Sequence, residues 1–224
     1  MRFEVICTLL LAILFGQPAY AKKVKRKGFN FGTSLRMMEF EKPTTVLNHD
    51  QENSRSTADI QSIKPFVGYS FANVISLGMT TVFEEEYREN TIKGTSANQN
   101  IERNELTNLS GGSLFVKLLF GRVMYLEAGG GYFQRNTNVE TKYIEEHADS
   151  TFNGRQEKLK IVTAGPGYYF GGGVALPIAS GFFFTTNYRI QLYKLKPYKT
   201  EENLVKSGDE KSRDISFGLA HYFN

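Results

Sequence analysis

The sequence predicts an all-β chain: a closed, up-and-down, antiparallel barrel of eight strands that spans a membrane. Three observations predict this fold. Eight segments alternate large apolar residues with small or polar ones, which is the period of two that a strand shows. Short and long connections between these segments take turns along the chain. Nearly all acidic residues after the first 21 positions fall in the long connections and not in the strands.

Composition narrows the class of protein further. The mean hydropathy of −0.34 excludes a bundle of transmembrane helices, because each helix needs about 20 apolar residues in a row. It is compatible with a membrane barrel, whose strands are apolar on one face only. The one cysteine, Cys7, lies in a segment that we interpret as a leader. A disulfide framework and a cysteine-ligated metal site are therefore both excluded.

The first 21 residues have the pattern of a secretory signal peptide. Arg2 precedes an apolar run over residues 5–15, and an Ala-Tyr-Ala site follows at residues 19–21. The apolar run is too short to span a bilayer. We therefore expect cleavage near Ala21, a basic N-terminal tail over residues 22–27, and a barrel domain over residues 28–224.

Each strand is predicted from its own alternation. The eight segments cover residues 29–37, 63–71, 75–83, 111–120, 124–132, 162–176, 182–192 and 214–223. Their large apolar face includes, in chain order, Phe31, Val67, Leu77, Val116, Leu126, Phe170, Phe184 and Phe217. The residues between these are mostly small or polar, such as Asn30, Gly68, Gly78, Ser113, Gly131, Asn187 and Ser216. This length suits a strand that crosses a bilayer.

The connections give a check on the register. Three of them are short and keep the apolar faces aligned, which sets Phe71 opposite Ile75, Phe120 opposite Met124, and Leu176 opposite Phe182. The other four are long and polar, over residues 39–57, 84–107, 134–158 and 194–213. This alternation predicts short periplasmic turns, long external loops and two termini in the periplasm.

A water-soluble ligand-binding barrel is the alternative fold. It would place its apolar face inward around a ligand and its charged face outward. The face between the large apolar residues is here built mainly from Gly, Ser, Thr and Asn, which are too small and too weakly charged for an aqueous exterior. We therefore expect the large apolar face to contact lipid.

The last strand carries a resemblance to a known family. Residues 216–223 alternate and close on an aromatic residue, and the signal consists of Phe217, Gly218, Leu219, His221 and Phe223. This end is similar to the signal by which the outer-membrane assembly machinery recognises its clients. The chain as a whole resembles the small eight-stranded outer-membrane barrels of Gram-negative bacteria, the OmpA-like and OmpX/OmpW-like superfamily. The resemblance implies export through the periplasm and insertion into the cell outer membrane.

The predicted lumen contains a group of polar and charged side chains. They are Arg36, Lys64, Lys117, Glu127, Arg189, Gln191 and Asp214. The register sets Lys117 opposite Glu127, close enough for a cross-strand ion pair. It also predicts a cluster of Arg36, Asp214 and Arg189. These groups form either a packed polar plug, since an eight-stranded barrel is just wide enough for side chains to fill, or a narrow conduit with an anion bias.

The remaining motifs favour no catalytic or cofactor chemistry. Among the three histidines, His49 and His147 fall in loops and His221 faces lipid or its interface, and no serine has a recognisable motif spacing. We expect no catalytic residue, no cofactor and no metal site. The basic residues 22–27 and the pI of about 9.0 are not interpreted as nucleic-acid binding.

One external segment is basic, and it fits either a contact with lipopolysaccharide phosphates or an ordinary solvated loop. Residues 194–213 hold six basic and four acidic residues, and the lysines that could contact lipopolysaccharide phosphates are Lys194, Lys196, Lys199 and Lys206. The sequence thus predicts a monomeric outer-membrane protein with a structural or surface-interaction role, whose loops contact an unidentified extracellular partner. The alternatives are a narrow channel for ions or small solutes and a lipid-modifying outer-membrane enzyme.

Overall fold

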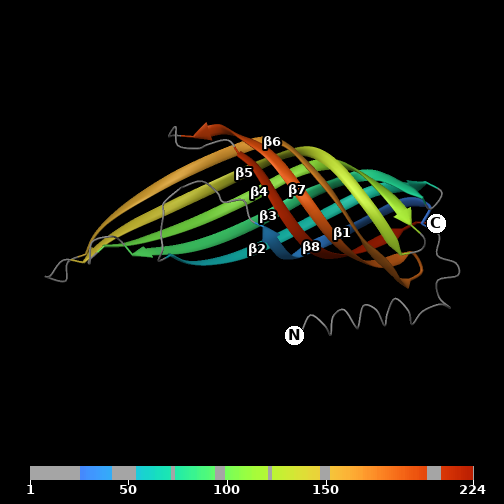
Figure 1. Cartoon of the computed structure of the whole chain (residues 1–224), viewed down its shortest axis with the longest axis horizontal. Coiled ribbons are helices and arrows are strands. Elements are labelled where there is room, and N and C mark those ends of the chain that lie inside the picture. Colours follow the sequence, from blue (N-terminus) through green and yellow to red (C-terminus); the bar gives the residue numbers. More distant parts are fainter. Residues whose placement is uncertain are drawn as a thin grey trace.

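In the computed structural model of the protein, eight strands form one closed antiparallel barrel (Figure 1). Every strand pairs with its neighbours in chain order, and the last strand pairs with the first. The predicted up-and-down, eight-stranded fold is confirmed. The strands are β1 (Gly28–Glu41), β2 (Ser54–Phe71), β3 (Ile75–Lys93), β4 (Gln99–Phe120), β5 (Met124–Glu146), β6 (Phe152–Ala179), β7 (Phe182–Thr200) and β8 (Gly208–Tyr222).

The structure describes residues 26–41, 54–71, 74–93, 99–120, 123–146, 152–200 and 208–223. The predicted signal peptide, His49, His147, Lys206 and Asn224 lie outside these residues. Within the described ranges, no helix is long and apolar enough to cross a membrane.

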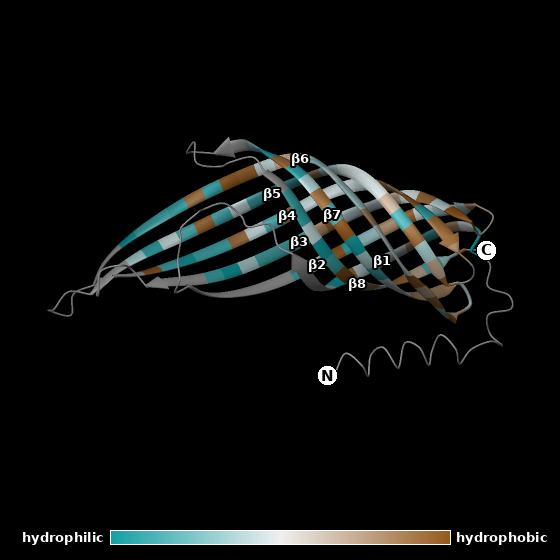
Figure 2. Ribbon diagram, in the orientation of Figure 1, coloured by the Kyte–Doolittle hydropathy of each residue, from teal (hydrophilic) through white to brown (hydrophobic). Residues whose placement is uncertain are grey.

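Hydrophobic residues alternate along the strands in the half of the barrel that contains the short turns (Figure 2), and the large apolar ones among them are exposed on the outside. Leu114 is 65% exposed and Met79 is 58% exposed, and the two are direct neighbours on β4 and β3. We call this band the apolar belt. It comprises the exposed large apolar residues of the strands that lie between the short turns and the polar strand extensions: Phe29, Phe31, Leu35, Ile63, Val67, Tyr69, Phe71, Ile75, Leu77, Met79, Phe83, Leu114, Val116, Leu118, Phe120, Met124, Leu126, Tyr132, Tyr168, Phe170, Phe182, Tyr188, Leu192 and Leu219. The alternate side chains point inward and are buried, among them Ser70, Ser76 and Ser216. The predicted assignment of the two faces is therefore confirmed.

Glycines allow aromatic rings to fit inside the barrel wall. Gly68 and Gly78 lie opposite each other on β2 and β3. A Cβ atom at Gly78 would come within 2.6 Å of the Cζ atom of Phe115. The absence of side chains at this pair makes room for the inward-pointing ring.

Two of the three short connections have the predicted register, and the third does not. Phe71 lies opposite Ile75, and Phe120 lies opposite Met124. Between β6 and β7, however, Phe182 pairs with Ala179, so the predicted pairing of Phe182 with Leu176 is wrong.

The difference at the third connection comes from one extra residue. The register shifts between Pro177 and Ala179, so that Ile178 has no partner on β7. Proline has no N–H group to donate to the ladder, which makes such a position suitable for a bulge. The chain then reverses through a two-residue turn whose second residue, Gly181, has φ 76°.

The strands also extend well beyond the predicted ones. The β3–β4 ladder continues to Lys93 and Asn100, and the β5–β6 ladder continues to Glu146 and Phe152. The expectation that residues 84–107, 134–158 and 194–213 form loops is therefore wrong for most of their length. Both faces of these extensions carry polar residues, so the backbone ladder continues without the apolar alternation that would indicate a strand.

The extensions form a sheet that projects from one end of the barrel (Figure 1). We call it the projecting sheet; it comprises residues 54–62, 84–93, 99–109, 135–146 and 152–163 of β2 to β6. The β1–β2 ladder ends at Leu35 and Ile63, and the β6–β7 ladder ends at Ile161 and Thr200. In the described part of the chain, the sheet is thus open along its outer edges.

Candidate functional site

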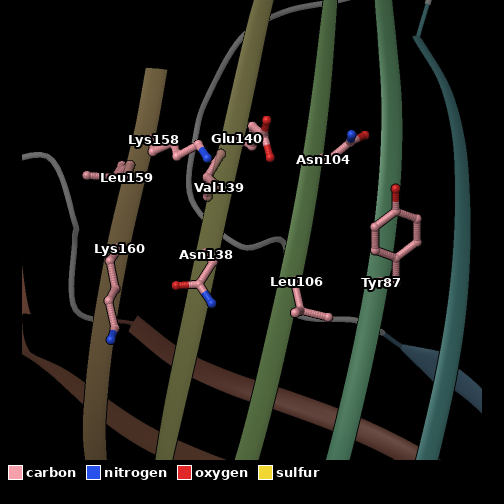
Figure 3. A pocket seen from close by; sticks show the side chains of 9 residues that line it. All are labelled: Tyr87, Asn104, Leu106, Asn138, Val139, Glu140, Lys158, Leu159 and Lys160. Atoms are coloured by element: carbon pink, nitrogen blue, oxygen red, sulfur yellow. The ribbon is translucent and has the colours of Figure 1, made fainter. Parts of the chain in front are cut away.

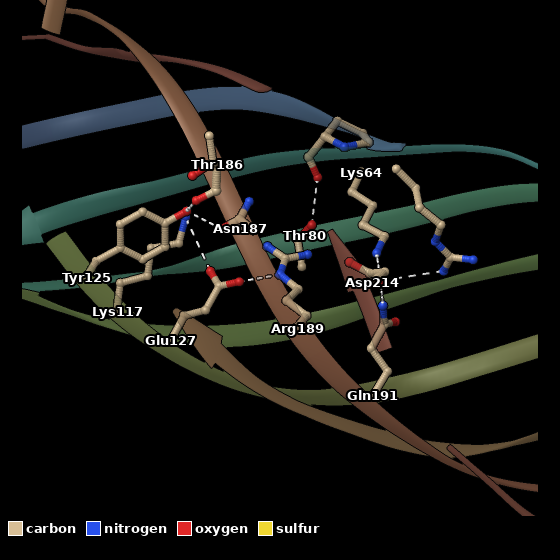
Figure 4. A network of polar contacts seen from close by, with 12 residues as sticks. Lys64, Thr80, Lys117, Tyr125, Glu127, Thr186, Asn187, Arg189, Gln191 and Asp214 are labelled. Atoms are coloured by element: carbon tan, nitrogen blue, oxygen red, sulfur yellow. Dashed lines mark hydrogen bonds and ion pairs between the residues drawn. The ribbon is translucent and has the colours of Figure 1, made fainter. Parts of the chain in front are cut away.

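The lumen contains a buried charge cluster that β4, β5 and β7 position. Lys117 and Glu127 lie opposite each other on β4 and β5, with Lys117 Nζ 3.5 Å from Glu127 Oε2 (Figure 4). Arg189 of β7 donates from Nε to Glu127 Oε1. Aromatic rings enclose the cations: Lys117 Nζ lies 4.3 Å from the ring centroid of Phe66, and the Arg189 guanidinium lies 4.9 Å from that of Tyr169. The carboxylate thus has two cations, each in contact with an aromatic ring.

A second cluster surrounds Asp214 of β8. Lys64 Nζ lies 2.7 Å from Asp214 Oδ2, and both side chains are fully buried. A nitrogen of the Arg36 guanidinium lies 3.6 Å from the same oxygen. Gln191 donates from Nε2 to Asp214 Oδ2 (Figure 4), and the hydroxyl of Tyr193 donates to Gln191 Oε1. This arrangement fixes the orientation of the carboxylate from β1, β2 and β7.

The predicted cluster of Arg36, Asp214 and Arg189 is wrong in one member. Arg189 lies directly opposite Asp214 in the β7–β8 register, yet its guanidinium bonds to Glu127. Lys64 takes its place at Asp214. With this distribution, Glu127 and Asp214 each have a cation at hydrogen-bonding distance, which burial of charge requires.

A third carboxylate in this part of the lumen belongs to Glu84, which the sequence predicts to lie in a loop. Glu84 Oε1 of β3 accepts a hydrogen bond from Arg36 Nη1 at 2.7 Å, and Glu84 Oε2 forms an ion pair with Arg36 Nη2 at 2.7 Å. The alternation along β3 could have placed Glu84 in the lumen, because this residue continues the inward-pointing series of Ser76, Thr80 and Val82 in the strand's period of two. Glu84 thus adds a third acidic group to the inward-facing charges that the sequence predicts.

Apolar layers lie on both sides of the charged clusters. The layer at the end with the short turns consists of Leu119, Tyr125, Ala175, Phe183, Ala220 and Tyr222. The layer toward the projecting sheet consists of Val82, Leu109, Phe133, Tyr193 and Leu195. Since charged side chains lie between these layers in the registers of β4, β5 and β7, the lumen is stratified as apolar, charged and apolar.

Arg26 adds to the first apolar layer. Its guanidinium donates to the carbonyl oxygen of Ala175 at 2.8 Å and lies 4.7 Å from the ring centroid of Phe183. The residue is only 4% exposed. The expectation of a basic tail over residues 22–27 is therefore wrong for Arg26, which enters the barrel; residues 22–25 are outside the described ranges. Nothing in the sequence distinguishes Arg26 from the neighbouring basic residues.

The C-terminal strand forms part of an aromatic group on the outside of the barrel. The ring centroid of His221 lies 4.2 Å from that of Phe182 and 4.6 Å from that of Phe223. Leu219 and Phe223 are exposed, and Gly218 lies opposite Ser34 of β1. That Phe217, Gly218, Leu219, His221 and Phe223 act as an assembly signal stays a prediction.

The predicted lipopolysaccharide contacts are only partly described. Lys194 and Lys196 are exposed and belong to strand β7, not to a loop. The side chain of Lys199 lies outside the described part of the structure. Among the described residues, no group of three or more His, Cys, Asp or Glu side chains could hold a metal ion.

Comparison with known proteins reveals similarity of structure only. No family model matches the sequence, and no curated protein matches it. The outer membrane protein OprG from Pseudomonas aeruginosa is 11% identical, with 89% of this chain and 99% of that chain covered and a TM-score of 0.39. The attachment invasion locus protein of Yersinia pestis is 11% identical, with 88% and 99% covered and a TM-score of 0.37. Neisserial surface protein A is 12% identical, with 88% of this chain and 98% of that chain covered and a TM-score of 0.36. These likenesses concern the fold and assign no function.

Proposed function

We propose that the protein is an integral outer-membrane barrel with a closed lumen, whose projecting sheet is a surface for interaction outside the cell. One observation carries this proposal: the barrel is apolar on its outside and is filled inside by paired charges between two apolar layers. The first half of this observation supports insertion into a membrane. The second half supports a structural or interaction role over transport.

The apolar belt favours contact with lipid over contact with water. A contiguous exposed apolar surface of this extent would promote association in water. The inward face holds paired charges and buried polar side chains between its two apolar layers, whereas a water-soluble ligand-binding barrel lines its interior with apolar residues and places its charges outside. In a closed ring every strand also has two neighbours, so the backbone groups within the belt are paired, as the interior of a bilayer requires.

The stratified lumen favours a closed barrel over a conduit. An ion that crossed the barrel would need to displace Phe183, Tyr222 and Arg26 at one end and Phe133 with Tyr193 at the other. It would also have to separate Asp214 from Lys64, which are fully buried. Side chains are expected to fill an eight-stranded barrel in this way.

We expect the folded chain to give no stable conductance steps in planar bilayers. The reason is that both apolar layers would have to open together for an ion to pass. Arg189→Ala should be recorded alongside, since it removes the cation nearest to Glu127 without changing either apolar layer. Ion-selective steps from the unaltered chain that change in the variant would contradict the closed lumen and favour the narrow channel.

Shortening the projecting sheet tests the interaction role. Glu86 lies opposite Thr107, and Thr137 lies opposite Ile161, so residues 87–106 and 138–160 can each be replaced by an Asn-Gly turn without a change of register. We expect bacteria that display the shortened barrel to lose adherence to coated surfaces, while the amount of folded protein in the outer membrane is unchanged. The control is a variant in which Lys194 and Lys196 on β7 are changed to Gln. Undiminished adherence of the shortened variant would refute the proposed role of the sheet.

A further inference from the structure

A shallow hollow lies on the outward face of the projecting sheet. Its volume is about 640 Å³, and strands β3 to β6 line it (Figure 3). The hollow is built on two adjacent cross-strand rows. The row nearer the belt is Tyr87, Leu106, Asn138 and Lys160, and the next row outward includes Asn104, Glu140 and Lys158.

The side chains of the hollow combine an apolar patch with hydrogen-bonding groups. Tyr87 and Leu106 are direct neighbours across β3 and β4 and supply the apolar part together with Val139 and Leu159. The amide of Asn138 can both donate and accept, and Gln156 donates a hydrogen bond to Glu140 that holds its carboxylate in place. Such a mixture of an apolar wall and a few polar groups is typical of a site for a small ligand.

These groups match the chemistry of a saccharide. A sugar ring has an apolar C–H face that can pack on Tyr87 and Leu106, and hydroxyl groups at its edge that can bond to amides and carboxylates. Lys158 and Lys160 are exposed, and neither is joined to a carboxylate among the described residues. Two such ammonium groups favour a ligand with an acidic substituent, such as a phosphate.

The height of the hollow above the apolar belt decides which kind of lipid headgroup can reach it. Tyr87 lies four residues beyond Phe83, the last belt residue of β3, on the same exposed face. At the usual rise and tilt of barrel strands, this separation places the hollow about 10 Å outside the belt. The headgroup layer of a phospholipid extends only about 5–8 Å beyond the hydrocarbon core. A phospholipid headgroup therefore ends below the hollow, whereas the saccharide of a glycolipid passes it.

We propose that the hollow binds the saccharide headgroup of a glycolipid in the surrounding outer leaflet, with an acidic substituent of the saccharide at Lys158 and Lys160. The inference rests on the proposed function, because the height is counted from a belt that lies in the membrane. The site is separate from Lys194 and Lys196, which lie on β7.

Two tryptophan reporters test this proposal in one experiment. The chain contains no tryptophan, so Tyr87→Trp and Phe83→Trp each introduce a single tryptophan that can be excited selectively over the tyrosines, the first in the hollow and the second in the belt. Each variant is placed in nanodiscs of phospholipid alone and of phospholipid with lipopolysaccharide. We expect Phe83→Trp to be shielded from an aqueous quencher in both discs, and Tyr87→Trp to be shielded only with lipopolysaccharide.

Titration of Tyr87→Trp with the delipidated oligosaccharide of lipopolysaccharide then measures the affinity of the site itself. We expect Lys160→Gln in this background to raise the dissociation constant about tenfold, and Asn138→Ala to raise it about fivefold. Lys142→Gln is the matched control, because Lys142 is exposed on the same sheet outside the hollow, and it should leave the constant unchanged.

The outcomes separate the inference from the proposed function. Loss of affinity in Lys160→Gln and Asn138→Ala, but not in Lys142→Gln, supports the site. Equal affinities in all variants overturn it. It is also overturned if Tyr87→Trp is shielded from the quencher as strongly in discs of phospholipid alone as in discs with lipopolysaccharide. If Phe83→Trp is open to the quencher in both discs, the belt is not in the bilayer and the proposed function itself fails.

Discussion

Asp214→Ala is expected to lower the free energy of unfolding of the barrel by about 3–5 kcal/mol, which is the usual cost of removing one partner of a buried ion pair. Asp214 is fully buried and lies 2.7 Å from Lys64 and 3.6 Å from Arg36. The variant would leave both cations in the lumen without this carboxylate. Urea titration of the protein in lipid vesicles, with tryptic protection as a second readout, measures the change.

Glu85→Ala is the matched control for this prediction. Glu85 is an exposed carboxylate on the outward face of β3, so its removal should change the free energy of unfolding by no more than about 0.5 kcal/mol. If Asp214→Ala were as mild as Glu85→Ala, water would have to reach Lys64 and Arg36, and the lumen would not be closed.

Leu114→Arg is expected to reduce the stability of the barrel in a bilayer by about 2–4 kcal/mol, the cost of a basic residue on the lipid face at the midplane. Leu114 is 65% exposed, and its neighbour Met79 lies midway between the two ends of the belt on β3. The free energy of unfolding in vesicles of defined composition measures the effect, and thicker bilayers should not reduce it.

Asn108→Arg serves as the control for the belt variant. Asn108 lies on the same face of β4, six residues along the strand and within the projecting sheet. Outside the belt, an arginine should cost little, because it remains hydrated. Equal small effects of the two substitutions would mean that the belt faces water, and the membrane location would be refuted.

Much of the barrel could be predicted from local pattern. The alternation of large apolar and small residues identified all eight strands, their two faces and the pairing at Phe71–Ile75 and Phe120–Met124. The pairing of Lys117 with Glu127 followed from the same register. These features are predictable because side chains alternate with a fixed period of two, and a tight hairpin transfers that period from one strand to the next.

The ends of the strands could not be predicted in this way. Along the projecting sheet both faces carry polar residues, so Glu84 and its neighbours lack a regular apolar alternation although their backbone is fully paired. The bulge at Ile178 was missed for a related reason: one extra residue shifts the register without altering the composition of the segment.

The sequence by itself thus determined the number of strands, their order, and which side chains point inward or outward, because these depend on neighbours within two residues. Only the tertiary structure decided which charges are partners. Closure of the ring brings Glu127 of β5 to Arg189 of β7, Glu84 of β3 to Arg36 of β1, and Arg26 to Phe183. The two ion pairs join strands that are not adjacent in the sheet, and Arg26 precedes the first strand. Long side chains can reach several partners across the lumen, so no local spacing encodes the choice.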